Sequence, residues 1–213
     1  DLSAQEGEMV AVIGHNGAGK STLLKALFGL IPLWKGAVLY DGQNSGDWPP
    51  PKKVLNGIGF VPQGNRVFGE LTVRENLEMA GYTLNGQPQI EKKIGEVLSF
   101  FPVLKERATQ LAGTLSGGEK QMLSLANILI LSPRLLLLDE PSLGLSPSLV
   151  KQAFQKLTEI NHALGTTMVI VEQKVREALK ICQSAYLLKM GRVAYAGASS
   201  ELLAGDRIKE IFL

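Results

Sequence analysis

Short apolar runs alternate along this chain with longer segments whose apolar positions recur at helical spacing. Continuous apolar runs of this kind are typical of strands buried on both faces of a parallel sheet. We predict such strands at residues 9–13, 57–61, 135–138 and 167–171, and a hairpin at 185–189 and 192–196. Residues 36–42 predict one more strand, closed by a glycine turn, and the polar, proline-rich residues 43–51 predict a surface loop.

Helices are predicted between these strands, at residues 21–29, 90–101, 117–131, 147–164 and 174–181, with two short ones at the end of the chain. Another begins at Thr72, which is followed three residues later by Glu75 in a capping-box pattern. The mainly helical residues 64–115 interrupt the alternation. We therefore expect a helical subdomain inserted into a single parallel α/β core, which residues 1–63 and 116–213 form.

The segment between the first strand and the first helix reads Gly14-His15-Asn16-Gly17-Ala18-Gly19-Lys20-Ser21, which fits the phosphate-loop pattern G-x-x-x-x-G-K-[ST]. Its glycines let backbone N–H groups approach phosphates, and the positive end of the following helix adds to the attraction. We expect Lys20 to reach the β- and γ-phosphates and Ser21 to give its hydroxyl to Mg²⁺. The pattern predicts a nucleoside triphosphate bound by residues 14–22, with Thr22 included.

Polar residues follow three further strands at the edge where parallel α/β sheets bind their ligands. Gln63 and the pairs Asp139-Glu140 and Glu172-Gln173 stand there. Two adjacent carboxylates at the end of an apolar strand are costly to desolvate unless a cation receives them. We expect Asp139 in the Mg²⁺ shell and Glu140 as the general base that polarises the water attacking the γ-phosphate.

Composition narrows the class of protein. The formal net charge is +2, and no run of five Lys or Arg residues recommends nucleic acid as a partner. The single Cys182 excludes an internal disulfide and a cysteine-cluster metal site, and suits the cytoplasm. The apolar runs are far shorter than the roughly 18 residues that a bilayer crossing requires. The polar start lacks Met and a secretory leader, so we expect the chain to begin within its domain.

With these motifs in this order, the sequence resembles the ATP-binding cassette (ABC) family of transport ATPases over nearly its whole length. The discriminating segment is Leu115-Ser116-Gly117-Gly118-Glu119, which matches the family signature, normally L-S-G-G-Q. The resemblance implies that Ser116, Gly117 and Gly118 hold the γ-phosphate bound by a second ATP-binding subunit, identical or homologous. It also implies that Gln63 contacts Mg²⁺ and couples to a membrane subunit.

The fold implied by the resemblance is a P-loop NTPase core of the RecA type with an inserted helical subdomain, the ABC nucleotide-binding domain. Glu119 stands where the signature has Gln, Ser146 where the D-loop has Asp, and Gln173 where the switch residue is His. We expect Gln173 to act as the switch by hydrogen bonding alone, because its amide is neutral and cannot take up a proton and become charged as a histidine can. The family stacks adenine on an aromatic residue upstream of the phosphate loop, so that residue and the N-terminal strand or strands are expected to be missing.

Within the family, four segments resemble the ATP-binding subunits of branched-chain amino-acid importers, namely residues 61–68, 71–77, 140–147 and 171–173. This implies a peripheral protein on the cytoplasmic face of the inner membrane, bound to membrane-spanning permease subunits. A periplasmic or extracellular solute-binding protein would be an indirect partner. Urea or amide importers, a non-transport cassette ATPase and a regulator without turnover remain alternatives, whereas a GTPase would need an Asn-Lys-x-Asp motif that is missing.

Overall fold

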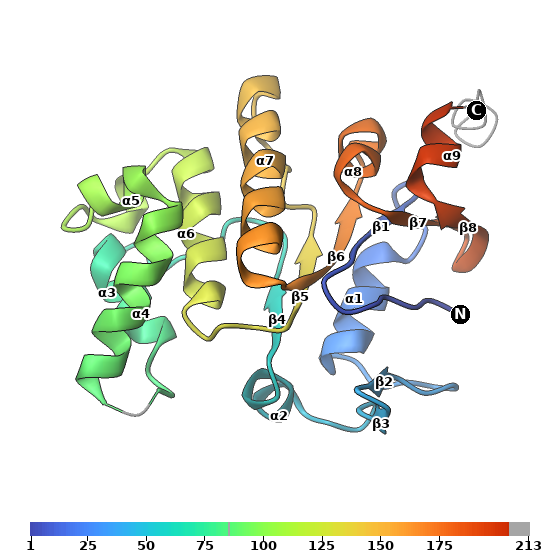
Figure 1. Cartoon of the computed structure of the whole chain (residues 1–213), viewed down its shortest axis with the longest axis horizontal. Coiled ribbons are helices and arrows are strands. Elements are labelled where there is room, and N and C mark those ends of the chain that lie inside the picture. Colours follow the sequence, from blue (N-terminus) through green and yellow to red (C-terminus); the bar gives the residue numbers. More distant parts are fainter. Residues whose placement is uncertain (85, 205–213) are drawn as a thin grey trace.

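The computed structural model describes residues 1–84 and 86–204. Its centre is a sheet with strand order β4-β5-β6-β1-β7-β8 (Figure 1). These strands are β1 (Met9–Ile13), β4 (Ile58–Val61), β5 (Leu135–Asp139), β6 (Thr167–Glu172), β7 (Ser184–Lys189) and β8 (Arg192–Ala198). All neighbours pair in parallel except β7 and β8, which form an antiparallel hairpin. The predicted α/β fold with a parallel sheet is confirmed, and the carboxyl ends of β1, β4, β5 and β6 share one edge.

The strands β1, β4, β5 and β6 are mainly apolar because both faces of the sheet are covered there. Along β1, Met9, Ala11 and Ile13 pack into one hydrophobic cluster. Val10 and Val12 pack into a second cluster on the opposite face. All five side chains are buried, so the sequence of β1 does not show the alternation of apolar and polar residues that marks a half-buried strand.

Helices cover both faces. One face carries α1 (Lys20–Phe28) and α2 (Pro50–Leu55), and the other carries α6 (Gly117–Leu129), α7 (Pro147–Leu164), α8 (Val175–Ile181) and α9 (Ser199–Ala204). Phe28 of α1 stacks on Phe60 of β4 with ring centroids 5.2 Å apart. Within the described ranges, none of the helices is both long and apolar enough to cross a bilayer.

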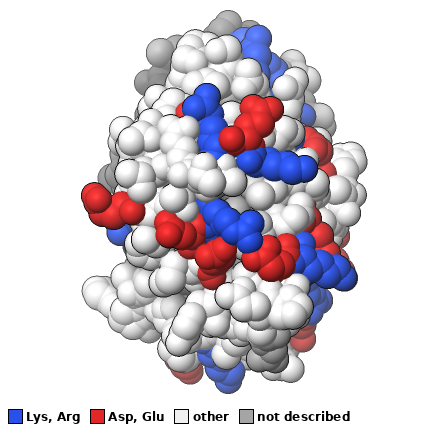
Figure 2. All heavy atoms as spheres, turned by 90° about the vertical axis from the view of Figure 1, so that its left-hand side faces the viewer, with Lys and Arg blue, Asp and Glu red and all other residues white. Residues whose placement is uncertain are grey.

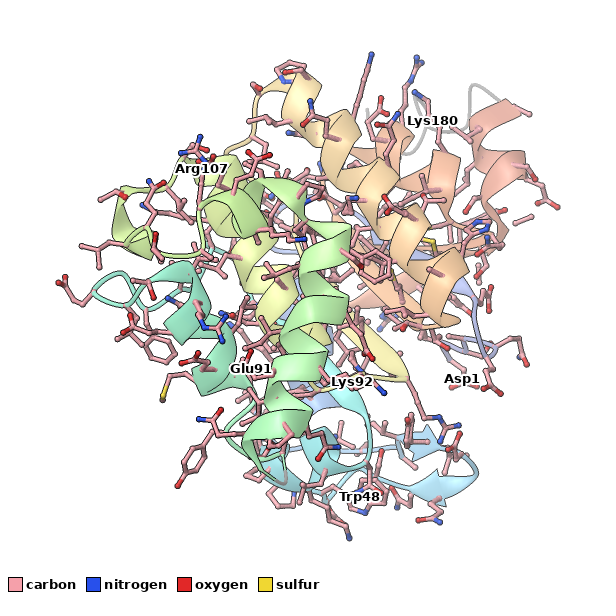
Figure 3. All side chains as sticks on the ribbon, turned by 60° about the vertical axis from the view of Figure 1, so that its left-hand side comes forward. Asp1, Trp48, Glu91, Lys92, Arg107 and Lys180 are labelled. Atoms are coloured by element: carbon pink, nitrogen blue, oxygen red, sulfur yellow. The ribbon has the colours of Figure 1, made fainter. Side chains whose placement is uncertain are left out.

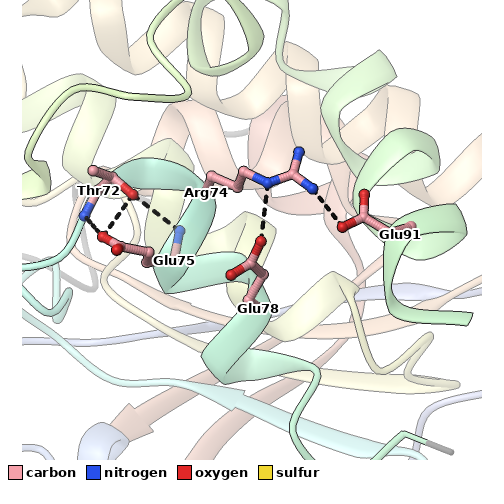
Figure 4. Close-up of polar contacts among 5 residues, drawn as sticks. All are labelled: Thr72, Arg74, Glu75, Glu78 and Glu91. Atoms are coloured by element: carbon pink, nitrogen blue, oxygen red, sulfur yellow. Dashed lines mark hydrogen bonds and ion pairs between the residues drawn. The ribbon is translucent and has the colours of Figure 1, made fainter. Parts of the chain in front are cut away.

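The helices between β4 and α6 lie together to the left of the sheet in Figure 1. They are α3 (Val73–Ala80), α4 (Gln87–Phe100), α5 (Pro102–Glu106) and the short 3₁₀ turn Ala112–Thr114. The capping box predicted at the start of α3 is present, with Glu75 accepting the Thr72 N–H at 2.7 Å. Arg74 bonds both Glu78 of α3 and Glu91 of α4, and so fastens the two helices together (Figure 4).

The outer face of this helical region carries charges of both signs. Figure 2 shows Lys and Arg interspersed with Asp and Glu across it. Glu91 and Lys92 lie on the exposed face of α4 (Figure 3), and Lys93 pairs with Glu96 at 2.9 Å on the same helix. Such exposed pairs contribute little stability, so the region is held mainly by its apolar contacts with α6.

The segment after α1 differs from its prediction. Residues 36–42 supply only the two-residue strand β2 (Leu39–Tyr40), which pairs with β3 (Gln43–Asn44) in a separate hairpin rather than joining the main sheet. Positive φ at Asp41 and Gly42 makes the tight turn between them. The predicted loop 43–51 therefore contains β3 and the start of α2. The prolines are compatible with this helix start, because a proline at the first helical position needs no N–H partner.

Lys53 of α2 was also not expected to be buried. Its side chain is fully buried, and its ammonium donates to the carbonyl of Leu27 near the C-terminal end of α1. Burial lowers the pKa of Lys53 below its ordinary value. The lysine thus joins α2 to the helix that carries the phosphate loop, and it is well placed there because cations stabilise helix C-termini. At the end of the chain, the second of the two predicted short helices lies outside the described residues.

Candidate functional site

A cleft of about 320 Å³ opens at the carboxyl edge of the sheet. Segments distant in the sequence meet in it because four parallel strands end at the same edge. Its lining residues are Asn16, Gly17, Gly19, Lys20, Ser21, Thr22, Gln63, Glu140 and Gln173. Each of them had been singled out from the sequence.

The phosphate loop runs from the end of β1 to the start of α1. Gly14 has φ 153°, and a Cβ there would lie 2.3 Å from the carbonyl oxygen of Leu188, so only glycine fits. Gly19 is the N-cap of α1 with φ 99°, and among the described residues no side chain caps the helix. The N–H groups at the start of α1 are therefore left for a ligand, which is the arrangement that binds anions.

Lys20 lies across this loop with only 5% of its surface exposed. Its ammonium donates to the carbonyl oxygens of Gly14 at 2.8 Å and His15 at 3.0 Å. The N–H of Ala18 donates to the same His15 carbonyl at 3.1 Å, and the Ala18 carbonyl accepts from Gly191 of the β7–β8 turn at 3.0 Å. The loop is thus closed around a cation that can turn toward an incoming phosphate.

Ser21, which lines the cleft, is hydrogen-bonded to Asp139. The Ser21 hydroxyl donates to Asp139 Oδ1 at 2.8 Å, and Asp139 is buried at the end of β5. Burial raises the pKa of Asp139 above its ordinary value, the bond from Ser21 opposes the rise, and nearby Glu140 adds to it. Lys25 and Lys20 lower this pKa as well, but by less, so burial prevails and a cation bound beside Asp139 would stabilise its charged form.

Glu140 lies at the centre of the cleft between two amides. Gln63 donates to one carboxylate oxygen at 3.2 Å, and Gln173 donates to the other at 2.6 Å. The backbone of Glu140 has φ 50°, a left-handed conformation that is uncommon outside glycine and concentrates at functional sites. Its N–H is held by the carbonyl of Val171 at 2.9 Å. The three residues predicted to act in hydrolysis are thus brought into direct contact.

Ser116, Gly117 and Gly118 lie elsewhere, at the start of α6. Within the described part of the chain they are not among the residues that line the cleft. Ser116 is the N-cap of α6 and forms a capping box with Glu119, which accepts the Ser116 N–H at 2.8 Å. Ser116 and Gly117 are exposed. The structure therefore separates this segment from the phosphate loop of its own chain.

Two further residues lie beside the cleft: Glu172, which its place at a strand end had singled out without giving it a role, and Lys174, which was not expected. The carboxylate of Glu172 is buried at the end of β6 and accepts the N–H of Ser142 at 2.9 Å. Lys174 donates to the carbonyl of the same Ser142 at 3.1 Å. The same signal, a carboxylate at the end of an apolar strand, singled out both Glu172 and Asp139 in the sequence. The hydrogen bonds of Glu172 to neighbouring loops could not be read from it.

The comparisons with known proteins agree with this geometry. Residues 1–143 match the family model described as ABC transporter. The chain is 41% identical over 212 residues, all of its length and 90% of the relative's, to the high-affinity branched-chain amino acid transport ATP-binding protein BraG of Pseudomonas aeruginosa. It is 40% identical, over 99% of its length and 89% of the relative's, to the probable branched-chain amino acid transport ATP-binding protein LivF of Archaeoglobus fulgidus.

A solved structure of the same fold is described as the dimeric structure of a post-hydrolysis state of the ATP-binding cassette MJ0796 bound to ADP and Pi. The match has a TM-score of 0.81 and 27% identity, and covers 93% of this chain and 88% of the other. Fold, cleft and sequence agree, and the chain belongs to the ABC transporter family, as an ATP-binding protein that hydrolyses ATP.

Proposed function

We propose that ATP hydrolysis by this chain drives the uptake of branched-chain or other small amino acids through membrane-spanning partner subunits. The observation that carries the proposal is the match to BraG and LivF, two amino acid transport proteins, over practically the whole chain. The chain would then lie on the cytoplasmic face of the inner membrane, attached through its permease partners. A solute-binding protein would deliver the amino acid on the other side.

In the proposed ATP complex the phosphates lie on residues 14–22. The free N–H groups at the start of α1 donate to phosphate oxygens. Lys20 exchanges its two carbonyl acceptors for oxygens of the β- and γ-phosphates, where its charge forms stronger bonds. Thr22 lines the cleft one residue beyond Ser21 and extends the polar wall along the phosphate chain.

The residues around Ser21 fit a magnesium ion. The hydroxyl of Ser21 already donates to the carboxylate of Asp139, and a cation bound beside them would offset the cost of burying the Asp139 charge. Within residues 1–84 and 86–204 no cluster of three or more His, Cys, Asp or Glu could hold a metal. Mg²⁺ suits such a site because it needs only one or two carboxylates and takes much of its remaining shell from phosphates and water. Ser21, Asp139 and Gln63 would hold it, and it would neutralise charge on the phosphates.

Glu140 is proposed as the general base for the attacking water. The amides of Gln63 and Gln173 hold its two oxygens and so fix the direction in which the carboxylate faces the cleft. A carboxylate held in this way can accept a proton from water at the moment of attack on the γ-phosphate. Gln173 needs no charge for this role, since its N–H₂ group donates and its carbonyl can orient the water.

Two ATP-binding subunits are proposed to share each ATP. At the start of α6, which does not line the cleft of its own chain, Ser116 and Gly117 are exposed, and buried Gly118 follows them. An anion from another molecule can reach it there. We propose that the γ-phosphate bound by one subunit contacts Ser116, Gly117 and Gly118 of the other, in an identical or homologous pair.

The permease contact is proposed in a groove of about 240 Å³ between β4, α3 and α6. Phe68 and Met79 in its lining are 58% and 50% exposed, and the lining also includes Pro62, the residue next to Gln63. An apolar segment of a permease would bury these side chains. Its arrival would act directly on the segment that carries Gln63 into the cleft.

Transport in vesicles tests the proposal. The chain is co-expressed with its permease subunits, reconstituted in proteoliposomes, and assayed for ATP-dependent uptake of radiolabelled leucine, with a Glu140→Gln complex as the inactive control. Leucine uptake that requires ATP is the expected result. Uptake of urea or an amide in place of any amino acid would support the alternative importer, and ATP hydrolysis without binding to any permease would favour a non-transport ATPase.

A further inference from the structure

The carboxylate of Glu172 joins the two loops that meet in the cleft. One loop follows Glu140, and the other carries Gln173. Glu172 is 1% exposed, which makes it one of the most deeply buried charged residues described. A buried carboxylate is costly unless hydrogen bonds satisfy it, so its partners show what the charge does there.

Each oxygen of Glu172 holds a different loop. Oε1 accepts the N–H of Ser142 at 2.9 Å, on the loop after Glu140. Oε2 accepts the N–H groups of Gln173 at 3.0 Å and Lys174 at 3.3 Å. Hydrogen bonds to an ionised acceptor are about twice as strong as neutral ones. The backbone positions of the two loops are therefore coupled through one side chain.

Lys174 completes the connection from the opposite direction. Its ammonium donates to the carbonyls of Ser142 at 3.1 Å and Leu145 at 3.4 Å. Ser142 is thus held through its N–H by Glu172 and through its carbonyl by Lys174. Gln173 lies between Glu172 and Lys174 in the sequence, and its side-chain amide donates to Glu140 at 2.6 Å.

We propose that Glu172 is a positioning residue for ATP hydrolysis, which holds the amide of Gln173 against the carboxylate of Glu140. The inference rests on the roles proposed above for Glu140 and Gln173. Glu172 itself does not line the cleft within the described chain, so it acts through its neighbours rather than on ATP. Lys174 supports the same arrangement by fixing the loop after Glu140.

The test begins with Glu172→Gln, which keeps the size of the side chain but turns one acceptor into a donor that faces backbone N–H groups. We expect kcat to fall about 10- to 100-fold, the worth of a hydrogen bond to a charged group. The affinity for ATP, measured by calorimetry, should change less than about threefold, because the phosphate loop is untouched. Glu177→Gln, on the partly exposed side of α8, is the matched control and should keep the parent kcat.

Combination with Gln173→Ala separates positioning from general support of the fold. If Glu172 acts through Gln173, the double variant Glu172→Gln/Gln173→Ala should hydrolyse ATP about as fast as Gln173→Ala alone. Lys174→Met provides a second variant that leaves Glu172 intact, and it should also lower kcat more than ATP affinity. Thermal unfolding of every variant is recorded beside the kinetics.

Three results would overturn the inference: parent kcat in Glu172→Gln, fully additive losses in the double variant, or a fall in ATP affinity that matches the fall in kcat and in thermal stability. Failure of the underlying proposal is distinct from these. Parent turnover in Gln173→Ala would remove the role of Gln173 itself. A slow Gln173→Ala beside a fast Glu172→Gln would remove only the positioning role of Glu172.

Discussion

The starts of α1 and α6 are both glycine-rich helix N-termini, yet they are capped differently. Gly19 caps α1 with backbone alone, and among the described residues no side chain accepts from its first N–H groups. At α6, Ser116 and Glu119 form a reciprocal capping box. The first helix start is incomplete without a ligand, whereas the second is partly satisfied by its own side chains.

Their surroundings differ in the same sense. Buried Lys20 lies over the start of α1, which faces the cleft that also contains Glu140. At the start of α6, Arg107 pairs with Glu119 at 2.9 Å, and it projects from the rim of the helical region (Figure 3). Hydrogen bonds from Ser116 lower the pKa of Glu119, and Arg107 lowers it further. One glycine pattern can thus build a helix start whose N–H groups are open to a ligand in the cleft, or an exposed helix start that its own side chains cap.

The largest expected effect lies in the cleft and not at α6. Glu140→Gln should lower ATP turnover about 10²- to 10⁴-fold, the usual worth of a general base, while the affinity for ATP is retained. Steady-state phosphate release and calorimetry measure the two quantities, with Glu159→Gln on the surface of α7 as control. Turnover at the parent rate would contradict the assignment of Glu140.

Lys20→Ala tests whether the open end of α1 is the ATP site. Affinity for ATP should fall about 100-fold, because the substitution removes the buried cation that is proposed to bind the β- and γ-phosphates, and turnover should fall with it. Calorimetry with Mg-ATP gives the affinity, and Lys92→Ala on the exposed face of α4 is the control. Unchanged affinity would argue against ATP on this loop.

Ser116→Arg tests whether the closed end of α6 serves a second subunit. ATP should still bind the variant, but hydrolysis by the pair should be lost, whereas Ser99→Arg on α4 should have no effect. A mixed pair of Ser116→Arg and Lys20→Ala subunits should regain about half of the parent activity, since one shared site carries both defects and the other neither. No recovery in the mixed pair would contradict function across subunits.

Arg107→Gln should give the smallest effect. It tests whether Arg107 neutralises the charge of Glu119 at the start of α6. The uncompensated Glu119 would repel the phosphate of the second subunit, so the KM for ATP in hydrolysis should rise about two- to fivefold, in line with an exposed ion pair. Glu119→Gln in the same chain should restore the parent KM, because glutamine can still cap the helix. A KM that stays raised in the double variant would show that Arg107 acts in some other way.

Several elements were predictable because their signals are local. The turn glycines, Lys20 and Ser21 occupy fixed positions between a strand and a helix, and they gather in the cleft as expected. The capping boxes at Thr72 and Ser116 follow from residues three apart. The short hairpin β2–β3 and helix α2 were misjudged, since their packing depends on contacts with distant residues, such as Lys53 with the end of α1.

By itself, the sequence determined the α/β fold, the phosphate loop and the strand-end residues, because periodicity and motif spacing are properties of neighbouring residues. Only the tertiary structure decided which strand ends meet. The order of the strands brings Gln63, Glu140 and Gln173 into contact, and it places Glu172 between two loops that lie 30 residues apart in the sequence. It also placed the start of α6 outside the lining of the cleft, among the described residues. Such relations depend on sheet order and burial, which no local pattern of residues encodes.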